Sequence, residues 1–293
     1  MSEPIHSGFD FTSQRHHDTY AAINPRDRDF TGKYVFITGA SKGIGEQTAL
    51  SYAQAGVAGI GIGARSDLSS LVPKLAEAAT AAGRQAPKIV AVHLDVTDEA
   101  SVDAAAKEVD KAFPRLDILV NNAGYLEKRA KIRDSDPNEW WKTWTINVKG
   151  PYLVTRAFLP QIIDKGGDKT IVNLGSIAAH LQAPGGSAYQ TSKLALQRFT
   201  EFLDADHGPD GVLTFAIHPG GVPTEMGLRL PKARQVALTE TPRLPADTIV
   251  FLTEKRREWL AARYISATWD VGELLSKEDE IVSEDKLKVR MRV

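Results

Sequence analysis

A tyrosine and a lysine four residues apart are the first side chains in this sequence that could do chemistry together. Tyr189 and Lys193 lie in the run Ser187–Lys193. On a helix, a spacing of four places both side chains on one face, one turn apart. An ammonium held close to a phenol favours the phenolate and lowers its pKa from the ordinary value of about 10. The pair predicts a tyrosine that exchanges protons near neutral pH.

A serine upstream could complete such a site. Ser176 lies thirteen residues before Tyr189, and its hydroxyl could hold a substrate oxygen. Taken alone, the Tyr-x-x-x-Lys spacing also describes a solvated pair on a helix surface, and Ser176 could be an ordinary turn residue. The rest of the chain has to decide between these interpretations.

A glycine-rich segment near the N-terminus indicates a nucleotide site. Residues 33–38 form a short apolar run of β-type residues, the segment 39–45 follows with three glycines, and residues 46–55 have a helical pattern. Glycines let the backbone turn tightly and approach a pyrophosphate, while free N–H groups at a helix N-terminus bind the anion. The spacing is Gly-x-x-x-Gly-x-Gly rather than the commoner Gly-x-Gly-x-x-Gly, and a plain tight turn is the alternative.

Strand and helix patterns alternate along the whole chain. This alternation predicts an α/β fold of the Rossmann type, with a doubly wound parallel sheet of seven strands and helices on both faces. Right-handed crossovers give the strand order 3-2-1-4-5-6, with the seventh strand at an edge. The predicted strands are 33–38, 57–64, 89–94, 116–120, 170–174, 212–217 and 264–267. The predicted helices are 46–55, 68–82, 98–112, 137–163, 187–206 and 245–260.

The residues that could do chemistry follow directly after predicted strands. In an open parallel sheet, ligands bind along the edge formed by the carboxyl ends of the strands. The residues that this rule brings to one edge are Gly39, Arg65, Asp95, Asn122, Ser176 and Pro219. Their convergence favours a binding site over a set of unrelated turns.

The motifs resemble those of the short-chain dehydrogenases/reductases, in the same order and over about residues 30–270. They are the glycine turn Thr38–Gly45, the turn Asn121–Gly124, Asn147, the set of Ser176, Tyr189 and Lys193, and the segment Pro219–Thr224. The two ends of the chain look most like fungal members of that family. The resemblance implies an oxidoreductase with a nicotinamide cofactor.

The resemblance also implies a role for each catalytic residue. In the reducing direction, Ser176 would hold a ketone oxygen and Tyr189 would protonate it as hydride arrives at the carbon. Lys193 would lower the pKa of Tyr189 and bond the cofactor ribose. Asn147 would hold a water that links Lys193 to solvent, although a polar residue at a helix kink is the alternative for Asn147 alone.

The expected cofactor contacts come from all the motifs. The segment Pro219–Thr224 would close over the nicotinamide, and Asp95 with Val96 would hold the adenine. The full set of expected contacts is Gly39, Ser41, Lys42, Gly43, Ile44, Gly45, Arg65, Asp95, Val96, Asn122, Ala123, Gly124, Tyr189, Lys193, Pro219, Gly220, Val222 and Thr224.

Two basic residues favour NADP(H) over NAD(H). Sites for NAD usually place an acidic side chain after the second strand, where it bonds the ribose 2′-hydroxyl. That position is Ala64 here, Arg65 follows it, and Lys42 lies in the glycine turn. A carboxylate would repel a 2′-phosphate, whereas a guanidinium can bind it in a fork. The alternative is that both are ordinary surface cations.

Composition excludes several classes of protein. The 293 residues are 42% hydrophobic, which suits one large catalytic domain over residues 1–293. A net charge of −1 gives no reason to expect nucleic acid or an anionic membrane as a partner, and the absence of cysteine excludes disulfides and thiolate metal sites. No basic and apolar leader and no apolar run of about 20 residues is present, so we expect a cytoplasmic protein without a membrane span. His16 and His17 lack partners at ligand spacing, and we expect no metal site.

Three parts lie outside the predicted sheet and helices. Residues 1–30 form an irregular arm, 224–244 should be a lid over the substrate, and the amphipathic tail 270–293 should pack on its own domain or on a neighbouring subunit. The lid is rich in apolar residues, which suggests a fairly bulky apolar ketone or alcohol as substrate. The resemblance implies a homodimer or homotetramer formed through the helices 137–163 and 187–206.

Aromatic residues on the long helices receive a structural interpretation. Trp140, Trp141 and Trp144 are expected to serve packing or an interface, and Phe199 and Phe202 are expected in the core.

Two other functions stay open for the whole chain. One is a non-redox nucleotide-binding scaffold on the same fold, and the other is a cyclase or isomerase.

Overall fold

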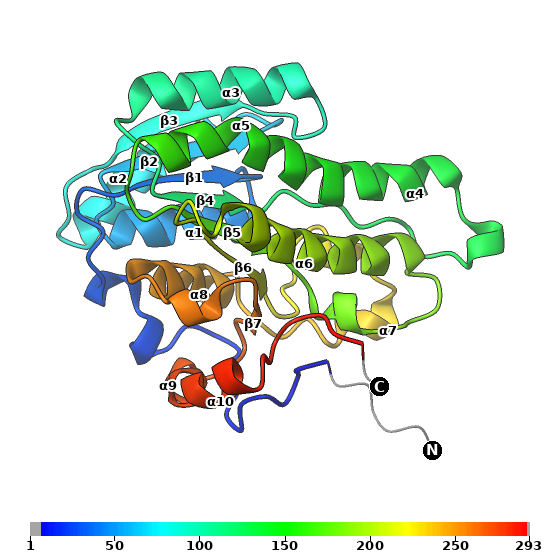
Figure 1. Cartoon of the computed structure of the whole chain (residues 1–293). Coiled ribbons are helices and arrows are strands. Elements are labelled where there is room, and N and C mark those ends of the chain that lie inside the picture. Colours follow the sequence, from blue (N-terminus) through cyan, green and yellow to red (C-terminus); the bar gives the residue numbers. More distant parts are fainter. Residues whose placement is uncertain (1–6, 292–293) are drawn as a thin grey trace.

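The seven predicted strands pair in one parallel sheet in the computed structural model, which describes residues 7–291 (Figure 1). Their order is β3-β2-β1-β4-β5-β6-β7, and every neighbouring pair runs parallel. The predicted doubly wound sheet is therefore confirmed. The strands are β1 Tyr34–Thr38, β2 Gly59–Ala64, β3 Lys88–His93, β4 Ile118–Asn121, β5 Thr170–Leu174, β6 Leu213–His218 and β7 Tyr264–Ser266.

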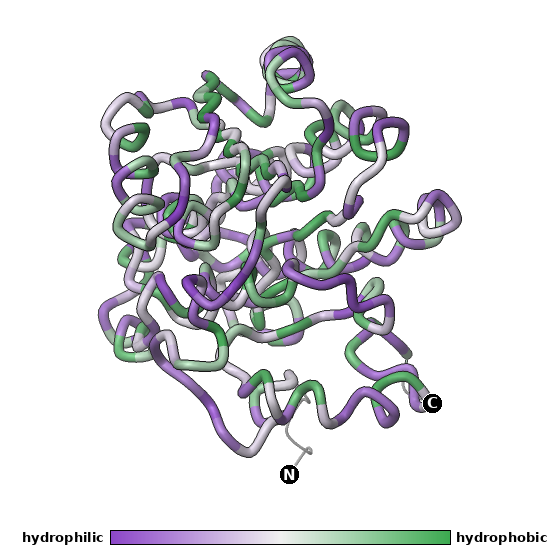
Figure 2. The backbone as a smooth tube through the Cα atoms, turned by 90° about the vertical axis from the view of Figure 1, so that its left-hand side faces the viewer, coloured by the Kyte–Doolittle hydropathy of each residue, from purple (hydrophilic) through white to green (hydrophobic). Residues whose placement is uncertain are grey.

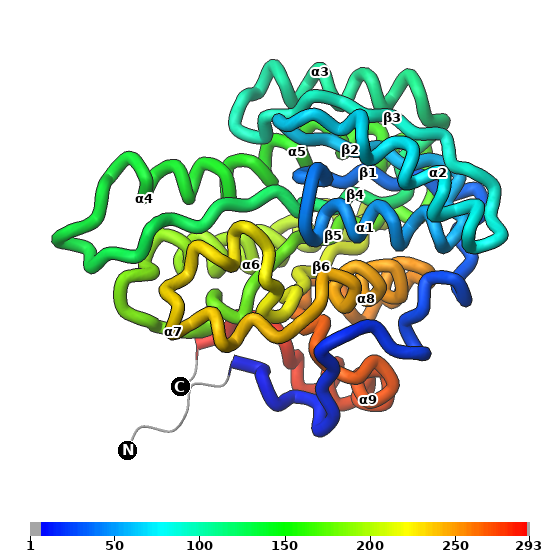
Figure 3. The backbone as a smooth tube through the Cα atoms, turned by 180° about the vertical axis from the view of Figure 1, so that it is seen from behind, coloured from blue at the N-terminus to red at the C-terminus, as the bar shows by residue number. Residues whose placement is uncertain are grey.

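Helices cover both faces of the sheet, each over its own apolar core (Figures 1 and 3). One face carries α1 Gly43–Gln54, α2 Leu71–Ala81 and α8 Arg243–Glu254, and the other carries α3 Glu99–Ala112, α5 Gly150–Asp164 and α6 Ser187–His207. Hydrophilic and hydrophobic stretches alternate along the covering helices (Figure 2), as expected for helices with one buried face. Among the described residues, no helix is long and apolar enough to cross a bilayer.

The predicted helix 137–163 is interrupted. The structure has α4 Pro137–Trp144, a π-helical turn Thr145–Lys149, and then α5. Gly150 allows close packing here, because a Cβ at this position would lie 2.9 Å from Cγ2 of Val96. π-Helical turns often occur at functional sites, and this one contains Asn147.

The predicted helix 245–260 was wrong at its end, because α8 stops at Glu254. Arg257 donates hydrogen bonds at 3.0 Å to the carbonyl oxygens of Phe251 and Leu252, in the last turn of α8. The guanidinium thus satisfies acceptors that a continuing helix would have used. A separate 3-10 turn, Glu258–Leu260, follows.

The N-terminal arm and the C-terminal tail lie side by side at the β7 edge of the sheet (Figures 1 and 3). His16 Nε2 lies 2.9 Å from a carboxylate oxygen of Asp270, and Phe11 packs on the buried Trp269. The tail forms α9 Val271–Ser276 and α10 Glu278–Ser283, which bury Leu274 and Ile281 against the domain. The tail therefore packs on its own domain. The predictions for residues 1–6, including the absence of a leader, and for residues 292–293 lie outside the described residues.

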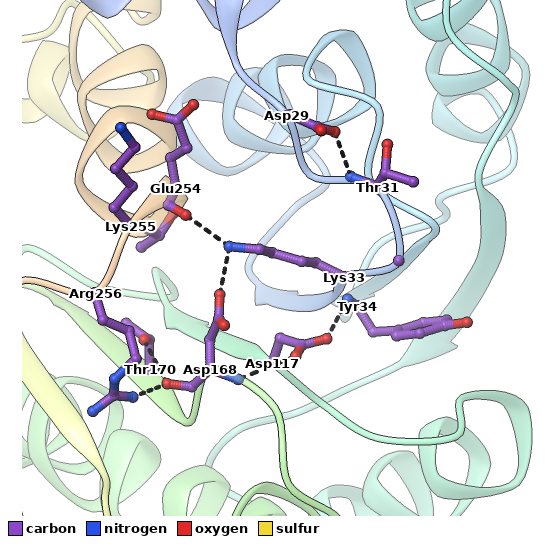
Figure 4. A network of polar contacts seen from close by, with 12 residues as sticks. Asp29, Thr31, Lys33, Tyr34, Asp117, Asp168, Thr170, Glu254, Lys255 and Arg256 are labelled. Atoms are coloured by element: carbon purple, nitrogen blue, oxygen red, sulfur yellow. Dashed lines mark hydrogen bonds and ion pairs between the residues drawn. The ribbon is translucent and has the colours of Figure 1, made fainter.

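A polar network joins the beginnings of the central strands (Figure 4). Lys33 Nζ pairs with Asp168 at 2.6 Å and donates to the carbonyl oxygen of Glu254 at 2.7 Å. The buried carboxylate of Asp117 accepts hydrogen bonds from the backbone N–H groups of Tyr34 (2.8 Å) and Asp168 (3.1 Å). These contacts fix β1, β4, β5 and α8 relative to one another, and so position the strand ends at the opposite edge.

Candidate active site

The glycine turn between β1 and α1 is shaped for close backbone approach. Gly39 and Gly43 have φ angles of +67° and +62°, a region that favours glycine. Helix α1 begins at Gly43 with no side-chain cap from Lys42, so its first N–H groups remain available to an anion. This geometry is compatible with the expected pyrophosphate site, which stays a prediction.

The turn after β4 packs directly against the glycine turn. A Cβ on Gly39 would lie 2.9 Å from Cα of Ala123, so only glycine fits. The side-chain amide of Asn122 donates to the carbonyl oxygens of Thr38 (2.8 Å) and Gly39 (3.1 Å). The Thr38 hydroxyl accepts from the N–H groups of Asn122 and Ala123, both at 3.0 Å. Asn122 therefore braces the nucleotide cradle, a role that its motif alone did not reveal.

The structure brings Ser176, Tyr189 and Lys193 together at the carboxyl edge of the sheet. Ser176 follows β5, and its Oγ accepts a hydrogen bond at 3.1 Å from the N–H of Ala178 at the start of the 3-10 turn Ile177–His180. The Ser176 hydroxyl also lies within hydrogen-bond reach of the Tyr189 phenol. Lys193 Nζ is 5.7 Å from the centroid of the Tyr189 ring and donates to the carbonyl oxygen of Leu174 at 2.6 Å.

Burial dominates the electrostatics of the pair. Burial raises the pKa of Tyr189, the hydrogen bond with Ser176 offsets part of that rise, and the negative charge of Glu127 adds to it. Burial also lowers the pKa of Lys193 to about 8. Burial thus sets a raised pKa for Tyr189 in this structure, and the lowering expected from the ammonium of Lys193 stays a prediction.

Asn147 is fully buried in the π-helical turn, where its side chain holds other parts of the site. Its Oδ1 accepts from the N–H of Tyr125 at 2.8 Å, and its Nδ2 donates to the Tyr125 carbonyl at 2.9 Å. Nδ2 also donates to the hydroxyl of Ser192 at 3.0 Å. Asn147 thus ties the segment after β4 to α6 beside Lys193, a contact that the sequence did not predict.

The two predicted cofactor-selecting cations differ in their surroundings. Lys42 forms an ion pair with Glu225, at the start of the predicted lid. Arg65 is exposed after β2, close enough to Asp95 to influence it. Burial opposes ionisation of Asp95, but hydrogen bonds from the N–H and hydroxyl of Thr97, together with the charge of Arg65, lower its pKa overall.

The segment after β6 is held by Glu240, which also contacts the N-terminal arm. Gly220 has a φ of +86°, and the N–H of Gly221 donates at 2.6 Å to the buried carboxylate of Glu240. The other oxygen of Glu240 lies 2.7 Å from Nδ1 of His17 in the N-terminal arm. Residues His17 and Glu240 lie 223 positions apart, so no local pattern could have indicated this link.

The segment predicted to be a lid contains a 3-10 turn, Gly227–Arg229, and a short helix, α7 Lys232–Gln235, and its role as a lid stays a prediction. Cε of Met226 lies over the turn after β4, 3.6 Å from where a Cβ on Gly124 would be. Leu228 and Val236 expose their side chains to solvent. The lid therefore offers apolar side chains beside the candidate site.

A cavity of about 530 Å³ lies on the outer side of the loop between β5 and α6. Its lining includes Ile132, His180, Leu181, Gln190 and Leu194, but none of the three clustered catalytic candidates. Its walls come mostly from the loop that joins Ser176 to the helix of Tyr189.

The aromatic residues of the long helices divide into two groups. Trp140 stacks on Trp144 and donates from Nε1 to the Ser187 hydroxyl at 3.2 Å, so the tryptophan cluster packs α4 against the start of α6. Phe199 packs partly buried against the core, as predicted. The core prediction for Phe202 was wrong, because the side chain lies on the solvent face of α6 and is 56% exposed.

Comparison with known proteins agrees with this arrangement. A family model described as short chain dehydrogenase matches residues 33–235, which include the glycine turn and all four catalytic candidates. The chain belongs to the short-chain dehydrogenase family. The resemblance found in the motifs is thereby confirmed for the family as a whole.

Fungal relatives are similar over most of their length. Short chain dehydrogenase mpl6 of Monascus purpureus is 50% identical over 291 residues, covering 99% of each chain. Short chain dehydrogenase andI of Emericella variicolor is 41% identical over 293 residues, covering 100% of each chain. The oxidoreductase family and its nicotinamide cofactor are therefore established, and the choice of cofactor and substrate is left to the residues of the site.

Solved structures share the fold. The chain is 27% identical to a 3-ketoacyl-(acyl-carrier-protein) reductase from Brucella melitensis complexed with NADH, with a TM-score of 0.71 over 81% of this chain and 97% of that chain. It is also 27% identical to an alcohol dehydrogenase from the archaeon Thermococcus sibiricus complexed with 5-hydroxy-NADP, with a TM-score of 0.64 over 76% of this chain and 91% of that chain. Both kinds of nicotinamide cofactor thus occur among its structural neighbours.

Proposed function

We propose that this enzyme interconverts a ketone and a secondary alcohol by hydride transfer with NADP(H). The observation that carries the proposal is the meeting of Ser176, Tyr189 and Lys193 beside a glycine turn with an uncapped helix N-terminus. A proton donor, an oxygen-binding hydroxyl and a phosphate cradle at one rim are what carbonyl reduction requires.

The residues of the rim fit a dinucleotide. The first N–H groups of α1 would hold the pyrophosphate, Asp95 and Val96 the adenine, and the segment Pro219–Thr224 the nicotinamide. When bound, the nicotinamide supplies the hydride that reduces the carbonyl carbon. Lys193, with only one hydrogen bond to protein among the described residues, has donors left for the ribose.

The preference for NADP(H) rests on Arg65 and Lys42. Arg65 is exposed next to the adenine side of the rim, where its guanidinium can bind a 2′-phosphate in a fork. Lys42 is the second cation, and a 2′-phosphate would compete with Glu225 for its ammonium. The absence of an acidic residue at Ala64 supports the same choice.

The proton follows a short path in the reducing direction. The Ser176 oxygen accepts from the N–H of Ala178, which orients the hydroxyl, and the ketone oxygen would replace the Tyr189 phenol as the acceptor of its hydrogen. Tyr189 then gives its phenolic proton to that oxygen as the new C–H bond forms, and its raised pKa keeps the proton in place until then. Lys193 stabilises the phenolate that results. Asn147 holds the loop and helix that carry these groups, and a water on its free lone pair would link Lys193 to solvent.

The lid favours a bulky apolar substrate. Met226 covers the turn after β4, and Leu228 and Val236 are free to contact a ligand. Exposed apolar side chains on α5 and α6, including Tyr152, Leu194 and Phe202, support a homodimer or homotetramer formed through these helices.

The direct test is turnover with a panel of bulky and small ketones. Loss of nicotinamide absorbance should accompany a product that carries two more hydrogens than the ketone, and NADPH deuterated at the transferred position should deliver one deuterium to carbon. NADPH binding without turnover of any ketone would favour the scaffold function. A product of unchanged mass would favour an isomerase or cyclase.

A further inference from the structure

Helix α6 begins without a cap of its own. Gly186 precedes the helix and has no side chain to accept from the first N–H groups. The N–H of Tyr189, in the first turn, instead donates to Oε1 of Glu127 at 3.1 Å. Glu127 lies 62 residues earlier, in the segment after β4. A residue from another part of the chain therefore supplies the cap at the position of the proton donor.

The capping side chain is a buried carboxylate. Glu127 is only 8% exposed, and its second oxygen is 3.5 Å from the hydroxyl of Thr143 on α4. A carboxylate at a helix N-terminus is stabilised by the free N–H groups and by the helix dipole, which compensates for burial. The cap therefore places a carboxylate oxygen on the backbone of the candidate proton donor.

An arginine two residues later secures the same junction. Arg129 donates from Nη2 to the carbonyl oxygens of Ala183 (3.1 Å) and Pro184, and the N–H of Ala130 donates to the carbonyl of Gly185 at 3.1 Å. In the segment after β4, Arg129 thus binds carbonyl oxygens that precede α6, and Glu127 binds the N–H of Tyr189 in its first turn. This complementary arrangement fixes the start of α6 relative to the β4 end of the rim.

We propose that Glu127 is a positioning residue for the candidate proton donor: its buried carboxylate caps α6 at the N–H of Tyr189 and keeps a negative charge beside that tyrosine. The inference rests on the proposed function, since it assigns Glu127 a part in the work of Tyr189. The charged and titratable groups around this carboxylate are Lys128 and Arg129 from its own segment, Asp134, Asp136 and Glu139 from the stretch that leads into α4, and Tyr189 from α6.

The carboxylate disfavours the phenolate and so raises the pKa of Tyr189. Ketone reduction needs the protonated phenol, so the rate falls as the pH rises through this pKa. Glu127→Gln keeps an oxygen that can accept from Tyr189 but removes the charge. The alkaline limb of the pH–rate profile for reduction should therefore move to lower pH in this variant, with little change in the KM for NADPH.

Glu127→Ala removes the cap as well as the charge. We expect kcat to fall about 10- to 100-fold, because small displacements of a catalytic group cost rate on this scale. The KM for NADPH should change little, because the hydrogen bonds of Glu127 go to Tyr189 and Thr143 and not to the glycine turn. Glu127→Gln should recover most of the lost kcat but not the original pH profile, which a purely structural residue would leave unmoved.

Glu139→Gln is the matched control. Glu139 borders the same small cavity of about 300 Å³, but its carboxylate binds Tyr125 and Lys142 instead of α6. The pH–rate profile of Glu139→Gln should match that of the parent enzyme. An equal shift in both glutamine variants, or an unshifted profile in Glu127→Gln, would overturn the proposal. The proposed function is tested separately, by activity that the parent has and Tyr189→Phe lacks. If that result holds and the Glu127 variants behave otherwise than expected, only the positioning role is wrong.

Discussion

Lys33 and Lys193 are both largely buried lysines at the ends of the sheet, and their ammonium groups have different partners. Lys33 lies at the amino-terminal edge, where Asp168 supplies an opposite charge at 2.6 Å (Figure 4). Lys193 lies at the carboxyl edge, 5% exposed, and its partner is the carbonyl oxygen of Leu174. The ammonium of Lys33 is thus compensated by a carboxylate. Within residues 7–291, the ammonium of Lys193 has no opposite charge as a hydrogen-bond partner, so burial disfavours its charged form.

Asp117 and two histidines show a similar contrast between the edges. At the amino-terminal edge, Asp117 accepts from two backbone N–H groups and from Nε of Arg115 at 2.8 Å. At the carboxyl edge, buried polar atoms of His180 and His218 have no hydrogen-bond partner among the described residues. Burial, together with the nearby His180, lowers the pKa of His218 to about 3, so its imidazole is neutral at physiological pH. In these examples the amino-terminal edge pairs its polar groups with protein, whereas groups beside the candidate site keep unused hydrogen-bonding capacity.

The largest expected effect is on the rate, at the carboxyl edge. Tyr189→Phe removes the proton donor, and turnover should fall by about 10²- to 10⁴-fold, the usual contribution of general acid catalysis. NADPH affinity and the melting temperature should stay close to those of the parent enzyme, because the ring remains. Steady-state kinetics, a binding titration and a thermal melt measure the three quantities. Unchanged turnover would remove Tyr189 from the mechanism.

The matching change at the amino-terminal edge should affect stability instead. Asp117→Ala leaves the N–H groups of Tyr34 and Asp168 without their acceptor, and we expect a loss of about 3 kcal/mol in the free energy of unfolding. The kcat of the folded enzyme should be unchanged. Asp110→Ala, which breaks an exposed pair with Lys165, should cost less than about 1 kcal/mol. Urea denaturation of both variants tests the contrast, and equal losses would contradict it.

A smaller effect should separate the two cofactors. Arg65→Asp places a carboxylate where the 2′-phosphate is expected, so NADPH affinity should fall about 10- to 100-fold while NADH affinity holds or rises. Arg156→Asp changes an exposed arginine on α5 that faces Glu99, and it should alter neither affinity. Fluorescence titration with both cofactors gives the ratio. Equal NADPH affinity before and after the Arg65 change would exclude Arg65 from the site.

The smallest effect, taken per pH unit, is the pH dependence of stability that Lys193 contributes. The pKa of Lys193 is about 8 in the folded protein and 10.5 ordinarily, so the folded state binds fewer protons between these values. Stability should therefore rise with pH over this window, by up to about 1.4 kcal/mol per pH unit from this residue, and level off outside it. Lys193→Met lacks this titrating group, so its stability should not rise in the same way. The stability of the parent relative to Lys193→Met should therefore increase as the pH rises across the window. A constant difference would contradict the desolvated charge.

Much of the fold was predictable because its signals are local. Strand and helix periods, the glycines of the nucleotide turn and the four-residue spacing of Tyr189 and Lys193 all act over short stretches of chain. Parallel pairing then brings the strand ends to one rim without further information. The cytoplasmic location and the homo-oligomer stay predictions.

The contacts that adjust the site were not predictable in this way. Glu127, Glu225 and Glu240 reach partners 62, 183 and 223 residues away, and nothing near them in sequence names those partners. The raised pKa of Tyr189 depends on burial, which spacing does not report. Phe202 shows the converse limit, since an apolar residue on a helix need not face the core.

The contact of His17 with Glu240 has a practical consequence. Through Glu240 the arm is fastened to Gly221, in the loop expected to cover the nicotinamide. Trimming the N-terminal arm for expression, or fusing a bulky tag close to it, would therefore disturb catalysis from a distance. Versions of the enzyme that begin after His17 should fold around their sheet and still turn over poorly.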